Sequence, residues 1–518
     1  MTTPSDEIDL PTTISRNAGV TILANLIYLV SRLFLPPFIL NHLTLNEYGI
    51  WTYCFIIVGY LGMGVYGIGN VYVRYIAVYT AQKETEKINR LVSTGVLFAA
   101  GLCLLCIPVL WFGLPYLIQA LKVSENLQTT AFWVIFGTTL IFLLDMVLSV
   151  FSYTLQSLHK FTIERTFWTL AILAEVIVIF LTLWWGWGLY GLLAAFAFRI
   201  IFFILLCFGA CKKLIPNFSI SPIHADKQDL HLFYNYGGVV QTTGIISVIN
   251  RSIERLVAGL SMGPATAALY DIGEKFPMMA TSVPSAINTV ILPTTSHLHA
   301  KEQHDQLVQV YLQSSRWINI ITGLMMGFLA PFATVLIAVW LGPKPEYAWA
   351  PFILACFTIA YQMDVLTGPG SAIYRGINRP WRELFYALLQ LGLVLAAIAT
   401  LFTLYGASVL TLNLAVVSMM VLSALIYIFR NNNFLNVPQW RFVKKVLLPG
   451  IFPYFLGGVL AYFSLPWQYS LFNERWTLFY TLLGALAVYL VVALPLYYYL
   501  ILAQEERSFL SKFFLFKR

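Results

Sequence analysis

Long apolar stretches recur along the whole chain, and short polar segments separate them. About twenty consecutive apolar residues can cross the hydrocarbon core of a bilayer as an α-helix. A transmembrane β-barrel would instead show segments of about ten residues with alternating polarity, and the sequence lacks them. The pattern predicts an all-α polytopic membrane protein with about fourteen transmembrane helices, at residues 17–39, 50–73, 91–113, 131–154, 166–184, 188–210, 235–259, 265–293, 314–341, 350–373, 384–405, 407–429, 446–465 and 476–502.

The composition supports this class and gives it an orientation. Hydrophobic residues make up 59% of the chain and charged residues 10%, which is more apolar than soluble globular domains are. The net charge is +8, and most basic residues fall in connections on the N-terminal side of the predicted spans. The opposite side has Lys122, Lys344 and Arg475. Because cytoplasmic loops are enriched in lysine and arginine, we expect cytoplasmic N- and C-termini and no nucleic-acid partner.

Two pairs of short similar segments indicate an internal repeat. Tyr48-Gly49-Ile50 opens the second predicted span, and Tyr270-Asp271-Ile272-Gly273 opens the eighth; a second pair follows the fourth and tenth spans. Such repeats are common in transporters. We therefore expect two pseudo-symmetric six-helix lobes and an extra C-terminal helix pair, arranged as a cytoplasmic tail (1–16), an N-lobe (17–232), a C-lobe (233–430), the pair (431–502) and a cytoplasmic amphipathic tail (503–518).

Charged residues concentrate in one apolar hairpin, from Ile246 to Lys275, with a Gly/Pro turn at 259–264. Charges at membrane depth are costly, so they mark transport pathways or compensating pairs. Arg251 and Arg255 are four residues apart and share one helix face. They also lie at depths similar to those of two acidic residues across the turn, so a cationic site and self-neutralisation both stay open. The remaining charged residues of the hairpin are Glu254, Asp271, Glu274 and Lys275.

Further charged residues lie inside other predicted spans. Glu175 and Arg199 flank the tight turn at Gly186 at equal depth, which predicts a structural ion pair between the fifth and sixth spans. Asp145 and Asp364 are single acidic residues in the corresponding fourth and tenth spans. A carboxyl group at membrane depth can couple transport to protons or sodium ions. It can also have a hydrogen-bonded structural role, and the sequence leaves both roles open.

Two N-terminal segments resemble a known family. They are residues 15–53, SRNAGVTILANLIYLVSRLFLPPFILNHLTLNEYGIWTY, and the glycine-rich residues 60–77, YLGMGVYGIGNVYVRYIA. Both look like the polysaccharide (O-antigen type) flippase family of the multidrug/oligosaccharidyl-lipid/polysaccharide (MOP) exporter superfamily. In organisation the resemblance covers the whole chain, including the extra helix pair of the lipid II flippases. It implies alternating-access export of an undecaprenyl-diphosphate-linked saccharide across the bacterial cytoplasmic (inner) membrane, for O-antigen (lipopolysaccharide), capsule or exopolysaccharide biosynthesis.

The resemblance also implies a binding site. Members of that family typically use a cationic central cavity, lined largely by spans 1, 2, 7 and 8, against the lipid diphosphate. Guanidinium groups suit this role, because they donate two hydrogen bonds to phosphate oxygens and stay charged when partly desolvated. The implied partners are membrane lipids, a polysaccharide polymerase and glycosyltransferases. The matching cations in this sequence are Arg32, Arg74, Arg251, Arg255 and Lys275.

We expect no catalytic residues, metal or cofactor. The Cys103-x-x-Cys106 pair has no His or acidic ligand near it in the sequence, and no Walker A pattern is present. The membrane potential, with or without a proton or sodium gradient, would supply the energy. The short external loops disfavour a membrane glycosyltransferase, and the loop after the second span lacks the signature of a major facilitator carrier. The main alternative is a multidrug cation antiporter of the same superfamily, with Asp145, Glu175 and Asp364 dominating its cavity.

Overall fold

The computed structural model describes residues 10–62, 68–82, 84–221, 226, 238–470, 474–502, 504 and 506–508. Every regular element in these ranges is a helix, which confirms the predicted all-α class. The chain divides into two compact units, Met1–Ala268 and Leu269–Arg518. Most of the predicted amphipathic tail at 503–518 lies outside the described residues.

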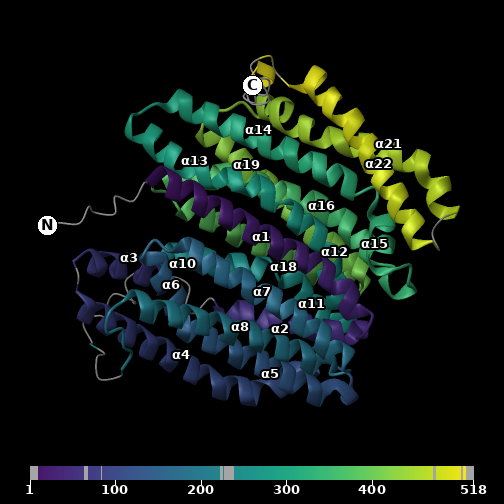
Figure 1. Cartoon of the computed structure of the whole chain (residues 1–518). Coiled ribbons are helices and arrows are strands. Elements are labelled where there is room, and N and C mark those ends of the chain that lie inside the picture. The colour runs from purple at the N-terminus through teal and green to yellow at the C-terminus, as the bar shows by residue number, and fades with distance from the viewer. Residues whose placement is uncertain are drawn as a thin grey trace. The chain divides into compact units, whose positions relative to one another are not determined.

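The first unit contains the helices up to the Gly/Pro turn at 263–264, and α4, α5 and α8 run alongside one another in it (Figure 1). A tight turn joins α7 to α8, where Gly186 and Gly188 have φ of 78° and 55°, a region that favours glycine. The elements are α1 (Leu10–Leu40), α2 (Leu45–Gly62), α3 (Ile68–Ala81), α4 (Thr85–Ala120), α5 (Glu125–Leu148), α6 (Val150–Ser157), α7 (Phe161–Trp184), α8 (Gly188–Leu214), α10 (Gly238–Asn250) and α11 (Ile253–Met262); α12 (Pro264–Ala280) begins in this unit.

The second unit contains the remaining helices, and α14, α21 and α22 lie side by side in it (Figure 1). Two of its short elements, η4 and η5, are π-helical, a rare conformation. The elements are α13 (Ser282–Ala300), α14 (His304–Leu329), α15 (Ala333–Leu341), the 3₁₀-helix η3 (Pro345–Tyr347), α16 (Ala350–Leu366), α17 (Gly368–Gly376), α18 (Trp381–Tyr405), α19 (Val409–Phe434), α20 (Gln439–Phe442), η4 (Val443–Leu447), α21 (Leu448–Ser470), α22 (Arg475–Leu496) and η5 (Tyr497–Ile501).

Ten helices among the described residues are long and apolar enough to cross a membrane, and an eleventh span results if α14 and α15 count as one. The ninth predicted span, 314–341, is therefore not the single continuous helix of the prediction. α14 and α15 meet at 68°, and Pro331 lies between them. Proline has no backbone N–H to donate, so it interrupts the helix. Five other predicted spans, the second, fourth, seventh, eighth and tenth, are each divided between two described α-helices, namely α2 with α3, α5 with α6, α10 with α11, α12 with α13, and α16 with α17.

Glycines allow α21 to approach α14 closely. A Cβ atom on Gly457 of α21 would overlap the backbone carbonyl of Gly327 in α14, whereas one on Gly458 would meet nothing within 4 Å. Small residues at helix interfaces permit such close backbone packing in membranes. Buried polar side chains add to the same interface: Asn319 of α14 donates to the Val446 carbonyl at 2.6 Å and accepts from Gln362 of α16 at 2.8 Å. The helix pair at the C-terminal end is thus joined to its unit by specific contacts.

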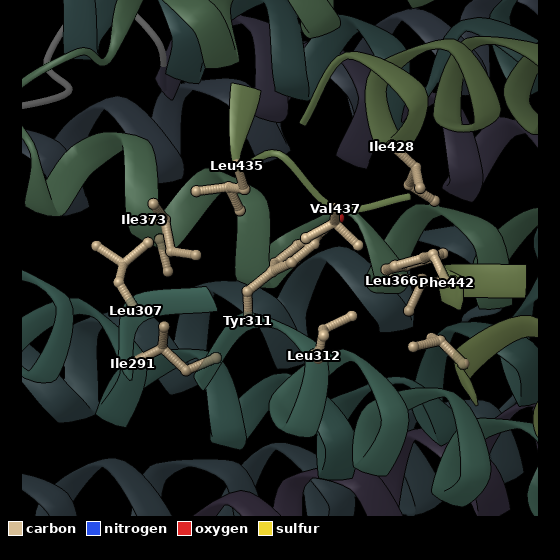
Figure 2. Close-up of a cluster of buried hydrophobic side chains, with 12 residues drawn as sticks. Ile291, Leu307, Tyr311, Leu312, Leu366, Ile373, Ile428, Leu435, Val437 and Phe442 are labelled. Carbon is tan, nitrogen blue, oxygen red and sulfur yellow. The ribbon is translucent and has the colours of Figure 1, made fainter. Parts of the chain in front are cut away.

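One apolar core of the second unit is drawn in Figure 2. It contains twelve buried residues from α13, α14, α16, α17, α19, α20, η4 and the loop between α19 and α20. Tyr311 lies at its centre, 1% exposed, and its ring stacks on Phe442 with centroids 5.6 Å apart. The Tyr311 hydroxyl donates to Asn432 Oδ1 at 2.9 Å, which satisfies the polar end of a buried ring.

Candidate functional site

The seventh predicted span is interrupted at one of its candidate arginines. α10 ends at Asn250 and α11 begins at Ile253, with a turn at Arg251 and Ser252. Ser252 leaves the helical region with φ −134° and ψ −3°, and its hydroxyl donates to the Tyr60 hydroxyl of α2 at 3.1 Å. Gly259 of α11 also packs directly on α2. These contacts hold the interrupted helix against α2, whose last residues begin the glycine-rich segment.

The two arginines of this span have different surroundings. The Arg251 side chain is exposed, and it forms neither a hydrogen bond nor an ion pair within the described part of its unit. Arg255 Nε lies 3.3 Å from Oε1 of the buried Glu254, and its guanidinium also donates to the Arg251 carbonyl. The positive charge of Arg255 is therefore partly compensated by a carboxylate, whereas the positive charge of Arg251 has no acidic partner in the described part of its unit.

The eighth predicted span supplies its own counter-charges. Lys275 Nζ lies 2.8 Å from Asp271 Oδ2, one helical turn earlier on α12. The buried Glu274 accepts a hydrogen bond from the Tyr361 hydroxyl of α16 at 3.2 Å. Pairing within one turn is what the four-residue spacing of Asp271 and Lys275 predicts. The positive charge of Lys275 is thus largely neutralised by its own helix.

A charged cluster joins three helices of the first unit. Glu175 of α7 is 1% exposed, and its two carboxylate oxygens lie 2.6 Å from Arg32 Nη2 of α1 and 3.3 Å from Arg199 Nε of α8. The Arg199 contact is the one that the turn at Gly186 predicts. The Arg32 contact was not predicted, because Arg32 was expected only as a candidate phosphate ligand. With two guanidinium groups and one carboxylate, the cluster has a net positive charge.

The two lone acids of the prediction differ in their environment. Asp145 of α5 has no hydrogen bond or ion pair to the described residues, although Arg199 is near enough for their charges to interact. Asp364 of α16 accepts a hydrogen bond from the buried Tyr386 hydroxyl of α18 at 2.9 Å. Asp364 thus has a hydrogen-bond partner in the fold. Protonation of Asp145 would disturb fewer direct contacts than protonation of Asp364. The ion-coupling role predicted for both stays a prediction.

Arg74, the last of the five candidate cations, lies on α3. Its side chain is exposed, and its guanidinium carbon is 5.5 Å from the centroid of the Tyr75 ring. No carboxylate pairs with it among the described residues. The structure therefore divides the five cations into two classes: Arg74 and Arg251 have no acidic partner in the described part of the chain, whereas Arg32, Arg255 and Lys275 each have one.

Comparisons with known sequences place the chain among membrane proteins of polysaccharide synthesis. A family model described as polysaccharide biosynthesis protein matches residues 42–349, more than half of the chain. An uncharacterized membrane protein, EpsK of Bacillus subtilis (strain 168), is 22% identical over 330 residues. That alignment covers 63% of this chain and 65% of the relative, so the chain spans less than two thirds of its relative's length.

Comparisons with solved structures give the fold. The lipid II flippase MurJ in an inward closed conformation superimposes with a TM-score of 0.66 at 15% identity, over 93% of this chain and 98% of that one. An inward-facing multidrug resistance MATE family transporter of the MOP superfamily gives a TM-score of 0.60 at 14% identity, over 80% and 94%. At these identities the likeness establishes the fold. The chain is a multi-pass membrane protein whose structural neighbours are transporters and flippases.

Proposed function

We propose, from the premise that this chain belongs to the polysaccharide biosynthesis protein family, that it is a secondary transporter that flips a lipid-linked oligosaccharide. The lipid would be undecaprenyl diphosphate, moved from the cytoplasmic to the outer leaflet of the bacterial inner membrane by alternating access, with both termini in the cytoplasm. Its product would serve O-antigen, capsule or exopolysaccharide synthesis. The MurJ-like fold supports this proposal.

The observation that carries the proposal is the exposed Arg251 at the interruption between α10 and α11. Broken helices at membrane depth are tolerated where protein or a water-filled cavity satisfies the freed backbone groups. In transporters such discontinuous helices form substrate sites. An arginine without a carboxylate partner at such a break is suited to a phosphate group, because it donates two hydrogen bonds in a fixed geometry.

We assign the first contacts with the diphosphate to Arg251 and Arg74. Arg255, Lys275 and Arg32 would contribute less in the state described, because each shares its charge with a carboxylate. The energy source is proposed to be the membrane potential, with or without a coupled proton or sodium ion. Outward movement of two phosphate charges down an inside-negative potential contributes about 4.6 kcal/mol per 100 mV, from about 2.3 kcal/mol per charge.

The test uses a strain that lacks this gene and retains the glycosyltransferases that build the lipid-linked saccharide. Polyprenyl lipids are extracted, and the leaflet that each lipid-linked oligosaccharide occupies is determined. We expect accumulation on the cytoplasmic leaflet that the wild-type gene reverses and the Arg251→Gln variant does not. Arg441→Gln is the matched control, since Arg441 is an exposed arginine of the short α20, outside the candidate set. Full export by Arg251→Gln would refute the assignment of this residue.

A multidrug cation antiporter is the second candidate, because one structural neighbour is a multidrug resistance transporter. That function would need acidic groups to dominate the site. The buried Glu175, one of the acids it would use, is instead shared between two arginines, which favours an anionic substrate. Normal lipid export in the deletion strain, together with new sensitivity to cationic dyes, would support the antiporter.

A further inference from the structure

A small, shallow cleft lies in the second unit, between the first turns of α18 and the last turns of α19. None of the five candidate phosphate ligands lines it, and the function proposed above does not use it. It is lined by Tyr374, Trp381, Arg382, Phe385, Tyr427, Arg430 and Asn431. Two cations, four aromatic rings and one amide are therefore brought together around one opening.

The two arginines of the cleft are supported by aromatic rings and not by acids. The Arg382 guanidinium carbon lies 4.1 Å from the centroid of the Phe434 ring, and Arg382 Nη1 donates to the Tyr374 hydroxyl at 3.1 Å. The Arg430 guanidinium carbon lies 4.2 Å from the Phe385 ring centroid. Neither arginine has an ion pair among the described residues. A cation over an aromatic face keeps its full charge for a ligand, because the ring attracts it without neutralising it.

Hydrogen-bonding capacity in the cleft is incompletely used. Arg382 Nε is buried without a hydrogen-bond acceptor in the described part of the chain. The Asn431 amide is 2% exposed, and neither of its polar atoms has a partner of ordinary hydrogen-bond geometry there, although the Tyr427 hydroxyl is nearby. That hydroxyl is within 3.0 Å of Ser371 Oγ. Buried polar groups are normally satisfied, so unused donors beside two cations point to an acceptor-rich anionic ligand.

The nearest acid of the same segment is already occupied. Glu383 follows Arg382 directly, but it accepts from Arg375, whose Nε is 2.6 Å from Glu383 Oε2. The charges of Arg382, Arg430 and the neighbouring Arg379 all act on the Tyr374 hydroxyl, so three guanidinium groups converge near one ring. The local charge is therefore positive, and a ligand would have to bring the compensating negative charge.

The position of the cleft indicates where such a ligand would come from. α18 begins at Trp381 and α19 ends at Phe434, and both helices are long and apolar enough to cross a membrane. The cleft lies at their ends, where a spanning helix is expected to reach the lipid headgroups. Trp381 is 51% exposed, as is typical of tryptophans at a membrane surface. The lysines and arginines of the connections predict that this is the cytoplasmic side. Anionic lipids give that leaflet a negative surface, and basic pockets between transmembrane helices bind their headgroups.

We propose that this cleft is a phosphate-binding site, held by Arg382 and Arg430 and completed by the Asn431 amide. A phosphate oxygen accepts hydrogen bonds from guanidinium and amide groups and neutralises the arginines at the same time. Two sources carry this chemistry at the membrane surface, the headgroup of an anionic phospholipid and a soluble phosphate. The inference is independent of the proposed transport function and survives its failure.

The test measures lipid binding to the purified full-length protein in detergent by native mass spectrometry. The probes are phosphatidylglycerol, phosphatidylcholine and inorganic phosphate. Wild-type protein should bind one phosphatidylglycerol in preference to phosphatidylcholine, and Arg382→Gln and Arg430→Gln should each weaken that binding about tenfold. Arg441→Gln is the matched control, because it removes the same charge from an exposed arginine of α20 outside the cleft and should change the affinity by less than about twofold.

The possible results distinguish a lipid headgroup, a soluble phosphate and the absence of a phosphate site. Loss of phosphatidylglycerol binding in both cleft variants, unaffected by millimolar inorganic phosphate, supports a lipid headgroup as the ligand. Displacement of the lipid by inorganic phosphate, with phosphate binding lost in the same variants, supports a soluble phosphate. Unchanged binding in both variants, or an equal loss in the control, overturns the proposal. If Arg382→Gln fails to fold, Arg430→Gln still provides the test, because Arg430 is exposed and its guanidinium lies over the Phe385 ring with no acidic partner among the described residues.

Discussion

Replacing Gly457 with alanine should loosen the contact between α21 and α14, whereas the same replacement at Gly458 should not. The two glycines are adjacent on α21 and differ in what a methyl group would meet. At position 457 the new Cβ would lie much less than 3.0 Å from the carbonyl oxygen of Gly327, and real Cβ atoms essentially never approach another heavy atom that closely. At position 458 nothing lies within 4 Å. The pair therefore isolates the steric cost of the close approach.

The size of the effect follows from the difference between the two sites. Alanine is the better helix former by about 1 kcal/mol, but this gain is common to both variants and cancels. Overpacking at a tight contact costs about 1–3 kcal/mol, and only Gly457→Ala incurs it. At 1.4 kcal/mol per tenfold change, the population with α21 separated from α14 should rise about 5- to 140-fold over that of Gly458→Ala.

A single buried cysteine reports on that population. Ala338 of α15 is 3% exposed and belongs to the apolar cluster that α15 forms with α21 and α22. The Ala338→Cys variant, made with the six native cysteines replaced, is labelled by a fluorogenic maleimide in detergent. The labelling rate should be higher for Gly457→Ala by the factor given above. A second version that keeps only the buried Cys54 of the first unit should label at equal rates, which separates local opening from global unfolding.

Equal Ala338→Cys labelling rates for the two glycine variants would refute the reasoning. They would mean that α14 and α21 can shift apart without cost, and that the closeness of their backbones does not hold the C-terminal helix pair in place. Faster labelling of Cys54 in Gly457→Ala alone would show that the substitution destabilises the whole chain.

Three further outcomes are expected. Glu175→Gln should lower the free energy of unfolding by about 3 kcal/mol. This value is the lower end of the range for breaking a buried ion pair, because both arginines are partly exposed. An unchanged melting temperature in scanning fluorimetry would contradict this expectation. Asn319→Ala should cost about 1–2 kcal/mol, since it leaves a carbonyl of η4 without its donor, and faster proteolysis of the C-terminal helix pair should reveal it. Tyr386→Phe removes a hydrogen bond to Asp364 and should spare lipid export, whereas Asp364→Asn should reduce it; equal defects would indicate a structural role for Asp364.

Local patterns in the sequence predicted local structure well. The apolar runs identified the helices, and the four-residue spacing of Asp271 and Lys275 corresponds to a pair within one helical turn. The turn at Gly186 likewise determines which depths of α7 and α8 meet, so Glu175 and Arg199 lie together. Each of these contacts joins residues of one helix or of two consecutive helices, where geometry follows from spacing alone.

Contacts between distant helices could not be predicted in this way. The Arg32–Glu175 pair depends on how α1 packs against α7, and nothing in either sequence segment specifies that neighbour. The bend between α14 and α15 was hidden because apolar residues continue on both sides of Pro331. Arg382 and Arg430 were counted only as loop charges that orient the chain, since their convergence depends on the packing of α18 against α19.

The shared carboxylate of Glu175 also has a consequence for biosynthesis. Arg32 is made 143 residues before its partner, an interval of roughly 7–29 s at about 5–20 residues per second. An arginine at the centre of a newly inserted helix costs about 2.5–3.5 kcal/mol. During that interval the nascent α1 carries an unneutralised guanidinium at the translocation machinery, whereas Arg199 emerges when Glu175 is already in place. The order of synthesis therefore leaves the apolar residues of α1 to offset this cost alone until Glu175 has been translated.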